Sequence, residues 1–167
     1  MEQKLAKPQW LKIKISVNDN FSSIKSVLKG HNLHTVCESA HCPNISECWN
    51  GGTATFMLMG DVCTRACKFC AVKTGNPMKS LDTEEPKKLA KALAEIKLFD
   101  YVVLTSVNRD DLEDGGASHF AECIKEVKKA YPNIIIEVLI PDFKGDAEAL
   151  GKIVDANPEV IAHNIET

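Results

Sequence analysis

The sequence predicts an α/β fold built around a parallel sheet. Apolar stretches rich in β-branched residues alternate four times with segments of helical periodicity. Such alternation is typical of βαβ units, and the nearly continuous apolar run IIIEVLI is typical of a strand that is covered on both faces. With 167 residues, of which 44% are hydrophobic and 26% charged, the chain has the size and composition of about one globular domain.

The first third of the chain is expected to be mostly irregular. We expect an arm over residues 1–18 and a short helix over residues 21–28, where four apolar side chains fall on one face. Residues 30–52 show little periodicity. Residues 53–59 are rich in β-forming residues and end at Gly60, so they predict a strand.

The rest of the chain alternates regularly after a loop that reaches to about Pro77. We expect a helix from its N-cap Thr83 to about Leu98, then a strand over residues 101–107 and the charged loop NRDDLEDGG. A helix over residues 117–130 and a strand over residues 134–140 should follow. A helix capped by Asp146 and a last strand over residues 160–167 complete the series. In the helix after Asp146, we expect Leu150, Ile153 and Val154 to face the core.

Charge and hydropathy exclude several classes of partner. The net charge of −3 gives no basic surface for a phosphate backbone, so we expect no nucleic acid. No apolar run approaches the ~20 residues of a membrane helix, so we expect no membrane partner. The lysine-rich start lacks the apolar core of a secretory signal and contains no arginine, which argues against a mitochondrial transit peptide. We therefore expect a cytoplasmic protein.

The seven cysteines indicate metal or redox chemistry, because they are clustered and odd in number. We call Cys37, Cys42 and Cys48 the upstream cysteines, and Cys63, Cys67 and Cys70 the downstream cysteines. Cys123 stands alone on the apolar side of a predicted helix, and we interpret it as a small buried hydrophobe.

The downstream cysteines, in CTRACKFC, place three thiolates within eight residues directly after a predicted strand. A structural zinc site needs four protein ligands, whereas a cubane iron–sulfur cluster held by three cysteines keeps one iron free. A zinc knuckle that borrows a distant His or Cys is the alternative. The upstream cysteines, in CESAHCPNISEC, also need a fourth partner; there the alternatives are buried structural cysteines or a zinc site that uses His41 or His34.

The spacing CxxxCxxC, with Phe69 before its last cysteine, resembles the signature of the radical S-adenosylmethionine (SAM) superfamily. The combination of CESAHCPNISECW with GGTATFMLMGDVCTRACKFC resembles the lipoyl synthase family. The resemblance extends to KPQWLK, LTSVNRDDLEDGG, IEVLIPDF and HNIET, and so it covers nearly the whole chain.

This resemblance implies two [4Fe-4S] clusters and SAM as cofactors. In the family, the cluster on the downstream cysteines reduces SAM to a radical that abstracts hydrogen, and the cluster on the upstream cysteines donates sulfur. Two sulfur atoms enter at C6 and C8 of a protein-bound octanoyl group, a reaction that side-chain acids and bases cannot perform. The implied partners are an octanoylated lipoyl-carrier domain and a flavodoxin or ferredoxin as electron donor.

Further residues are implied by analogy with radical SAM relatives. Phe69 would pack near the adenine, Asn164 would lie near SAM or substrate, and Glu166 would reach the ribose hydroxyls. Core packing is the alternative for Phe69, and ordinary strand-end polarity is the alternative for Asn164 and Glu166.

The charged loop carries weaker signals. Gly115 and Gly116 indicate a turn or a close backbone approach. Arg109, Asp110 and Asp111 either shape the site or form a solvated acidic turn.

Taken with the resemblance, the sequence predicts two regions: residues 1–52 as an irregular N-terminal extension that carries the upstream cysteines, and residues 53–167 as the N-terminal part of a radical SAM partial (β/α) barrel. Four strands make about half of a closed barrel, which usually needs ~200 or more residues. In the family, a serine from a C-terminal segment completes the upstream site, and we find no matching segment here. We therefore expect these residues alone to be an incomplete enzyme.

Two alternative functions and one question about the N-terminal lysines remain open at this point. Another radical SAM enzyme with an auxiliary cluster, such as one resembling biotin synthase, is disfavoured by the upstream spacing. A non-catalytic metal or electron-transfer protein is the alternative from a different class. The six lysines of residues 1–29 either meet an acidic carrier domain or form a solvated arm.

Overall fold

The computed structural model describes Pro8, residues 19–78 and residues 80–165. The arm predicted over residues 1–18 lies, apart from Pro8, outside the described residues, and so does Glu166. None of the described helices is both long and apolar enough to cross a membrane.

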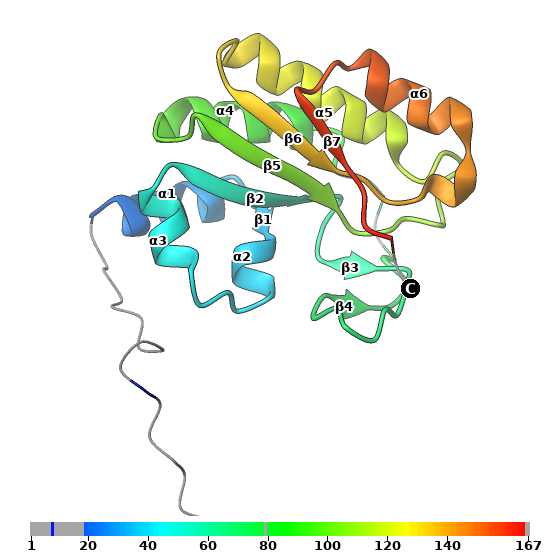
Figure 1. Cartoon of the computed structure of the whole chain (residues 1–167), viewed down its shortest axis with the longest axis horizontal. Coiled ribbons are helices and arrows are strands. Elements are labelled where there is room, and N and C mark those ends of the chain that lie inside the picture. Colours follow the sequence, from blue (N-terminus) through cyan, green and yellow to red (C-terminus); the bar gives the residue numbers. More distant parts are fainter. Residues whose placement is uncertain (1–7, 9–18, 79, 166–167) are drawn as a thin grey trace, which may run out of the picture.

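A five-stranded sheet in the order β1-β2-β5-β6-β7 forms the centre of the molecule (Figure 1). Its strands are β1 (His34–Thr35), β2 (Thr53–Leu58), β5 (Tyr101–Ser106), β6 (Ile135–Leu139) and β7 (Val160–Ala162). The four longer strands run parallel, and β1 pairs antiparallel with β2. The predicted α/β fold with a parallel sheet is therefore confirmed.

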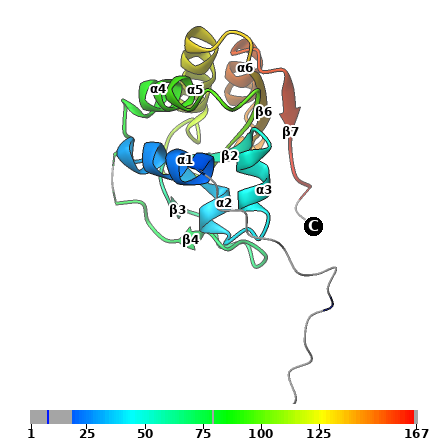
Figure 2. The same ribbon diagram turned by 90° about the vertical axis from the view of Figure 1, so that its left-hand side faces the viewer.

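Three helices cover one face of this sheet: α4 (Glu85–Ile96), α5 (Ala117–Ala130) and α6 (Ala147–Asp155). The segments that carry the upstream and downstream cysteines lie on the other side, as Figures 1 and 2 show. Along β5, Val102 and Leu104 are fully buried beneath the helices, whereas Tyr101, Val103 and Thr105 alternate with them and are only partly buried. The core therefore lies between sheet and helices, and the opposite face is the one that a barrel would enclose.

The ends of the helices test the predicted caps. The Asp146 carboxylate accepts hydrogen bonds from the backbone N–H groups of Glu148 and Ala149, at 2.9 and 3.3 Å, so this N-cap is confirmed. The predicted cap at Thr83 is wrong, because α4 has Glu84 as its N-cap residue and that side chain makes no capping hydrogen bond. Pro86 lies in the first turn of α4, where backbone N–H groups have no acceptor within the helix, so its lack of an N–H costs nothing and favours a helix start here.

The apolar stripe of α6 faces the core only in part. Ile153 is buried as predicted, but Leu150 and Val154 are 42% and 52% exposed, so the prediction is wrong for these two residues. The small side chain of Ala149 packs inward instead. The reason is that α6 is the last helix of its layer, and it packs against α5 on one side. Helical periodicity finds an apolar stripe but does not say which part of it has a neighbour.

Residues 30–52 are more regular than predicted. They contain β1 and two short helices, α2 (Val36–Ser39) and α3 (Ile45–Asn50). Helices of four and six residues are too short to display a period. Tertiary packing holds them: the Trp49 ring is fully buried and lies 5.1 Å, centroid to centroid, from Phe21 of α1 (Asp19–Gly30).

The loop after β2 also contains structure that the sequence did not predict. Two short parallel strands, β3 (Val62–Cys63) and β4 (Lys73–Thr74), pair within it. At the end of the chain, β7 stops at Ala162, so the strand predicted over residues 160–167 is shorter than expected.

Candidate functional site

A cavity of about 560 Å³ lies at the carboxyl ends of the parallel strands. This end of an α/β sheet is where ligands bind, because the loops that follow the strands converge there. All three downstream cysteines line the cavity, and so do Phe69 and Asn164. The structure thus brings together the downstream cysteines and the two described residues implied for SAM binding, whereas the candidate residues of the charged loop do not line this cavity.

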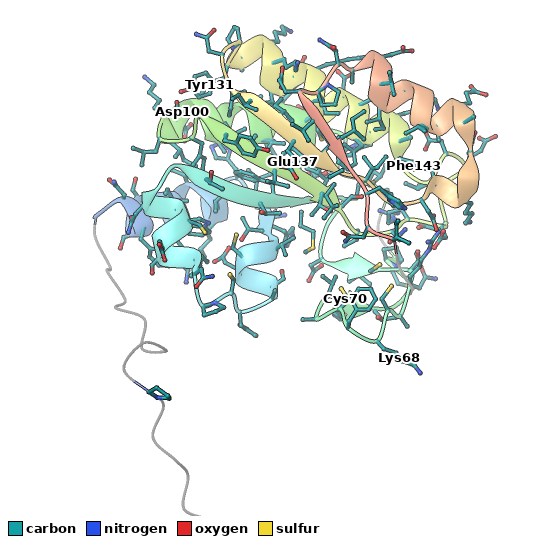
Figure 3. The ribbon with its side chains drawn as sticks, viewed as in Figure 1. Lys68, Cys70, Asp100, Tyr131, Glu137 and Phe143 are labelled. Atoms are coloured by element: carbon teal, nitrogen blue, oxygen red, sulfur yellow. The ribbon has the colours of Figure 1, made fainter. Side chains whose placement is uncertain are left out.

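The downstream cysteine loop is closed by backbone hydrogen bonds. The Gly75 N–H donates to the Cys63 carbonyl at 2.9 Å, which joins the loop's two ends through β3 and β4. The Cys70 N–H donates to the Cys67 carbonyl at 3.1 Å and turns the chain between these two cysteines. Cys63 is half-buried, whereas Cys67 and Cys70 are exposed (Figure 3 labels Cys70). The loop therefore presents its thiols from an ordered backbone.

Backbone N–H groups point at two of these sulfurs. The Cys63 Sγ accepts from Asn108 at 3.3 Å and from Arg65 at 3.5 Å, and the Cys70 Sγ accepts from Val72 at 3.4 Å. An N–H donor stabilises the negative charge of a thiolate, and hydrogen bonds to cysteine sulfur tune an iron–sulfur cluster. The residues present therefore fit a cluster held by three thiolates.

Arg65 fastens the cysteine loop to two neighbouring loops. Its guanidinium donates two hydrogen bonds of 2.9 Å to Asp110, which follows β5, and bonds of 2.7 and 2.9 Å to Asp142, which follows β6. The hydrogen bond from Arg65 lowers the pKa of Asp110 well below its usual range, and it lowers the pKa of Asp142 to about 2. Sequence reasoning missed Arg65 and Asp142, although an arginine between two cysteines of the motif was a visible signal.

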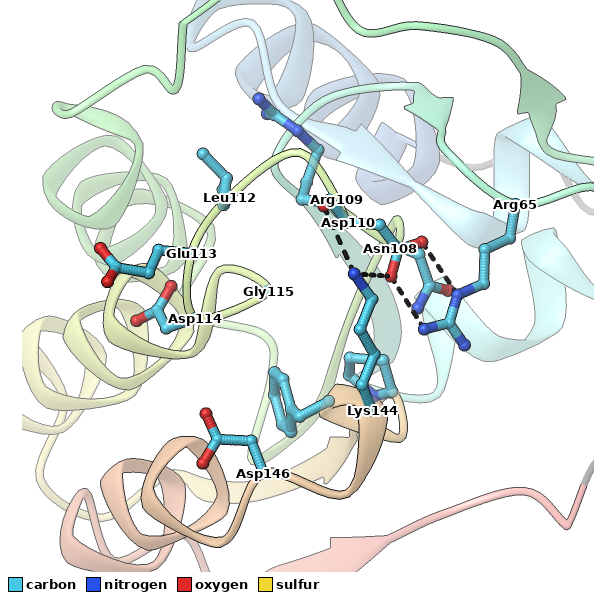
Figure 4. Close-up of a pocket in the computed structure, with 12 residues that line it drawn as sticks. Arg65, Asn108, Arg109, Asp110, Leu112, Glu113, Asp114, Gly115, Lys144 and Asp146 are labelled. Carbon is cyan, nitrogen blue, oxygen red and sulfur yellow. Dashed lines mark hydrogen bonds and ion pairs between the residues drawn. The ribbon is translucent and has the colours of Figure 1, made fainter.

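The charged loop is a network of pairs and not a solvated turn. Lys144 approaches Asp110 from the side opposite Arg65, at 3.3 Å (Figure 4). The buried Arg109 donates to both oxygens of Asp111, at 2.8 and 2.7 Å. Arg109, Asp110 and Lys144 border a smaller hollow of about 200 Å³, which shares Arg65, Asn108 and Pro141 with the main cavity. Through Arg65, Asp110 connects the loop after β5 to the downstream cysteine loop.

The residues implied for SAM binding lie at the cavity's mouth. The Phe69 ring is 72% exposed, so core packing does not account for it. Asn164 is also exposed. Its neighbour His163, which the sequence analysis did not single out, lines the cavity and donates from Nδ1 to the Ile140 carbonyl at 2.9 Å. Asn164 is thereby next to a residue that is tied to the end of β6.

The upstream cysteines form a second group. Cys37 lies in α2, Cys42 follows that helix, and Cys48 lies in α3. The Cys42 N–H donates to the Cys37 carbonyl at 3.0 Å. Burial raises the pKa of the Cys48 thiol, and the nearby sulfurs of Cys37 and Cys42 raise it further. Val36, the residue before Cys37, lines the main cavity, whereas the upstream cysteines themselves are not among its lining residues.

Other potential ligands lie elsewhere. Among the described residues, Glu85, His119 and Cys123 form the one group of three metal-type ligands whose donor atoms lie within 4.8 Å of one another. Neither His34 nor His41 belongs to such a group. Cys123 is fully buried, as predicted, and burial raises the pKa of its thiol.

Comparison with known proteins covers the whole chain. The model for the radical SAM superfamily matches residues 57–167, and the model for the N-terminal domain of lipoyl synthase matches residues 1–42. The chain is 58% identical over 171 aligned residues to a lipoyl synthase of Halorubrum lacusprofundi, covering 100% of this chain and 54% of that protein. It is 57% identical to a lipoyl synthase of Caldicellulosiruptor bescii and 54% identical to one of Myxococcus xanthus, covering 98% and 100% of this chain and 55% of each relative. The chain thus spans about half the length of the curated relatives it matches.

Proposed function

Because the chain belongs to the radical SAM superfamily, and within it to the lipoyl synthase family, we propose that it carries the sulfur-inserting site of a lipoyl synthase. The reaction inserts two sulfur atoms, at C6 and C8 of a protein-bound octanoyl group. The observation that supports this most is that the downstream cysteines line a cavity at the strand ends whose wall also includes Val36, the residue next to the first upstream cysteine. A single cluster would suffice for radical generation alone, whereas sulfur insertion needs a sulfur source beside it.

Membership of the superfamily implies a [4Fe-4S] cluster and SAM, and the downstream cysteines are the residues that would hold this cluster. When bound, the pair supplies the radical chemistry that no side chain can supply. The chain's own part is to orient and to exclude water. The N–H groups of Asn108 and Arg65 hold the Cys63 sulfur, and apolar side chains such as Leu139 and Ile140 line the wall of the cavity. Phe69, Asn164 and Glu166 are proposed to contact SAM.

The upstream cysteines are proposed to hold a second [4Fe-4S] cluster that donates sulfur. Two features support this assignment: Cys37 and Cys42 lie close enough to Cys48 to raise the pKa of its thiol, and Val36, next to Cys37, lines the cavity. Residues 1–52 would then act as the sulfur-donating extension and residues 53–167 as the radical-generating barrel segment.

The substrate would be an octanoylated lipoyl-carrier domain, and the electron donor a flavodoxin or ferredoxin. We propose a cytoplasmic location, because clustered cysteines that serve metal or redox chemistry are typical of a reducing compartment.

The decisive experiment is anaerobic reconstitution of this chain with iron and sulfide, followed by metal analysis and addition of SAM with a reductant. We expect iron at the downstream cysteines and release of 5′-deoxyadenosine, with any iron at the upstream cysteines held less firmly. Zinc without iron, or iron without SAM cleavage, would support a non-catalytic metal or electron-transfer protein instead. Conversion of an octanoylated carrier domain to its lipoylated form, by an enzyme that carries this chain, then separates lipoyl synthase from a biotin-synthase-like enzyme.

A further inference from the structure

A buried carboxylate outside the cavity holds the strand end from which the downstream cysteine loop starts. Glu85 lies in the first turn of α4 and is 6% exposed. Both of its carboxylate oxygens accept the backbone N–H of Met59, at 3.2 and 2.9 Å. Met59 directly follows β2, where the ladder with β5 has ended. Because a buried N–H without an acceptor is costly, Glu85 supplies the partner that the sheet no longer provides.

Met59 needs this support because its backbone is strained. Its φ of 67° lies in the left-handed region, which a residue with a long side chain rarely adopts. The next residue, Gly60, has a φ of 95°. These two residues turn the chain out of the sheet, and Cys63 follows only three positions after Gly60. A change of backbone at Met59 therefore moves the first downstream cysteine.

The Glu85 carboxylate is itself held by a partner from another helix. The His119 Nε2, in the first turn of α5, lies 2.6 Å from Glu85 Oε2, and both side chains are less than a tenth exposed. A buried carboxylate without such a partner would be unfavourable. The contact also ties the starts of α4 and α5 to the end of β2, so that three elements meet at one carboxylate.

Cys123 completes a set of donor types that also suits zinc, since its sulfur lies within 4.8 Å of the ligand atoms of Glu85 and His119. The hydrogen bonds account for the geometry without an ion. Both Glu85 oxygens already accept from Met59, and one of them also meets His119. An ion would have to displace these contacts, so we interpret the group as a hydrogen-bonded pair beside a buried thiol.

We propose that Glu85 and His119 are positioning residues for the downstream cysteine loop. They hold Met59 in its left-handed conformation and so fix the direction in which residues 60–63 leave the sheet. That direction decides whether the Cys63 sulfur meets the Asn108 N–H. The inference rests on the proposed cluster at the downstream cysteines, although its first test needs no metal.

The first test measures hydrogen exchange of the metal-free chain over residues 59–75 in Glu85→Ala, Glu85→Gln and Glu95→Ala. Glu95 is the matched control, because it lies on the same helix and pairs with a histidine, His31, at 3.2 Å on the surface. We expect exchange about tenfold faster in Glu85→Ala, the wild-type rate in Glu95→Ala, and recovery in Glu85→Gln, whose amide oxygen still accepts from Met59. Equal rates in Glu85→Ala and wild type overturn the proposal. If Glu85→Ala does not fold, His119→Ala replaces it, because it keeps the carboxylate and removes only its partner.

The second test follows loss of iron to a chelator. It uses a background in which the upstream cysteines are replaced by alanine, so that only the downstream cluster contributes. We expect Glu85→Ala to lose iron about tenfold faster and Glu85→Gln to restore retention. In the reverse background, with the downstream cysteines replaced, Glu85→Ala should change nothing. Wild-type retention in Glu85→Ala would overturn the positioning role and leave the proposed function intact. No iron at the downstream cysteines of the wild-type chain would refute the proposed function, and the exchange experiment would still decide the role of Glu85.

Discussion

The guanidinium of Arg65 and the carboxylate of Asp110 make a two-point contact, with Nε and Nη2 each 2.9 Å from a carboxylate oxygen. The remaining donors of Arg65 reach Asp142. Bidentate pairs of this kind fix relative orientation as well as distance. Because the three residues come from the loops after β2, β5 and β6, one side chain aligns the cysteine loop with two other strand ends.

This arrangement predicts an acid sensitivity that depends on Arg65. The pKa of Asp142 is lowered to about 2, from about 3.9 in the unfolded chain, chiefly by the hydrogen bond from Arg65. A lowered folded-state pKa stabilises the fold above the unfolded pKa, so this contribution is full above about pH 4 and is lost as the pH falls toward about 2. We expect Arg65→Ala to flatten the dependence of the free energy of unfolding on pH in that window. Urea denaturation at several pH values measures it.

The matched control for that experiment is Glu122→Gln, which removes an exposed carboxylate on α5. It should leave the pH dependence between about 4 and 2 close to that of the wild type, since exposed charges contribute little. An unchanged slope in Arg65→Ala would contradict the assigned role of the Arg65 contacts.

Replacing Cys67 by alanine should abolish reductive cleavage of SAM. The loop offers three thiols, so the loss of one leaves the cluster without a sufficient set of ligands. Cys123→Ala is the control, because this thiol is fully buried in α5 and should be dispensable for iron binding. The small cavity that it leaves should lower only the stability of the fold. Release of 5′-deoxyadenosine and iron content measure the outcome. Full cleavage by Cys67→Ala would refute the assignment of the downstream cysteines.

Replacing Cys42 should separate the two proposed clusters. The upstream group lies on α2, α3 and the turn between them, so its loss leaves the downstream loop in place. We expect the iron that the upstream group holds to be lost and SAM cleavage to persist. In an enzyme that makes lipoyl groups, the same change should abolish sulfur insertion. A normal yield of lipoylated product from Cys42→Ala would exclude the upstream cysteines as the sulfur source.

Gly116 is predicted to be intolerant of a side chain. Its φ is 89°, and a Cβ there would overlap the Met59 Sδ, which would have to shift. Gly116→Ala should therefore lower the free energy of unfolding by about 2 kcal/mol or more, from the left-handed backbone and the overlap together. Gly151, inside α6, has open space around it, and Gly151→Ala should raise stability by about 0.5–1 kcal/mol. Urea unfolding of both variants gives the comparison; equal stabilities would show that Gly116 has room to relax.

Those elements whose pattern is long and uniform were predictable. The run over residues 134–140 correctly predicted a strand, but not that it is covered on both faces: Ile136 and Val138 are fully buried, whereas Ile135 is 43% exposed. The helix over residues 117–130 begins and ends where its apolar period does. The short helices α2 and α3 were not predictable, because they depend on packing such as that of Trp49 on Phe21. Likewise, the spacing of apolar residues in α6 could not show that Val154 has no neighbour covering it among the described residues.

The site divides in the same way. The spacing of the downstream cysteines identified a cluster motif from eight consecutive residues. The side chains that hold those cysteines in place are far away in sequence: Asp142 meets Arg65 across 77 positions, and Glu85 meets Met59 across 26. No local pattern encodes such contacts. The cluster ligands can be found from their spacing in the sequence, whereas the residues that position them can be found only once the fold is known.

The two edges of the sheet differ, because β1 is antiparallel to its neighbour and β7 is parallel to its own. Strand β1 occupies the outer side of β2, so that edge is already paired, while β7 at the other end has a neighbour only in β6. Val160 and Ile161 of β7 are about two-fifths exposed, and on α6 Leu150 and Val154 are exposed as well. Among the described residues, β1 and β7 are the two edge strands, and β7 is the one that continues the parallel order of the sheet. A complementary segment supplied in trans should seat itself on β7 and leave the cysteine-bearing end undisturbed, as in the reassembly of a split protein from two separately made pieces.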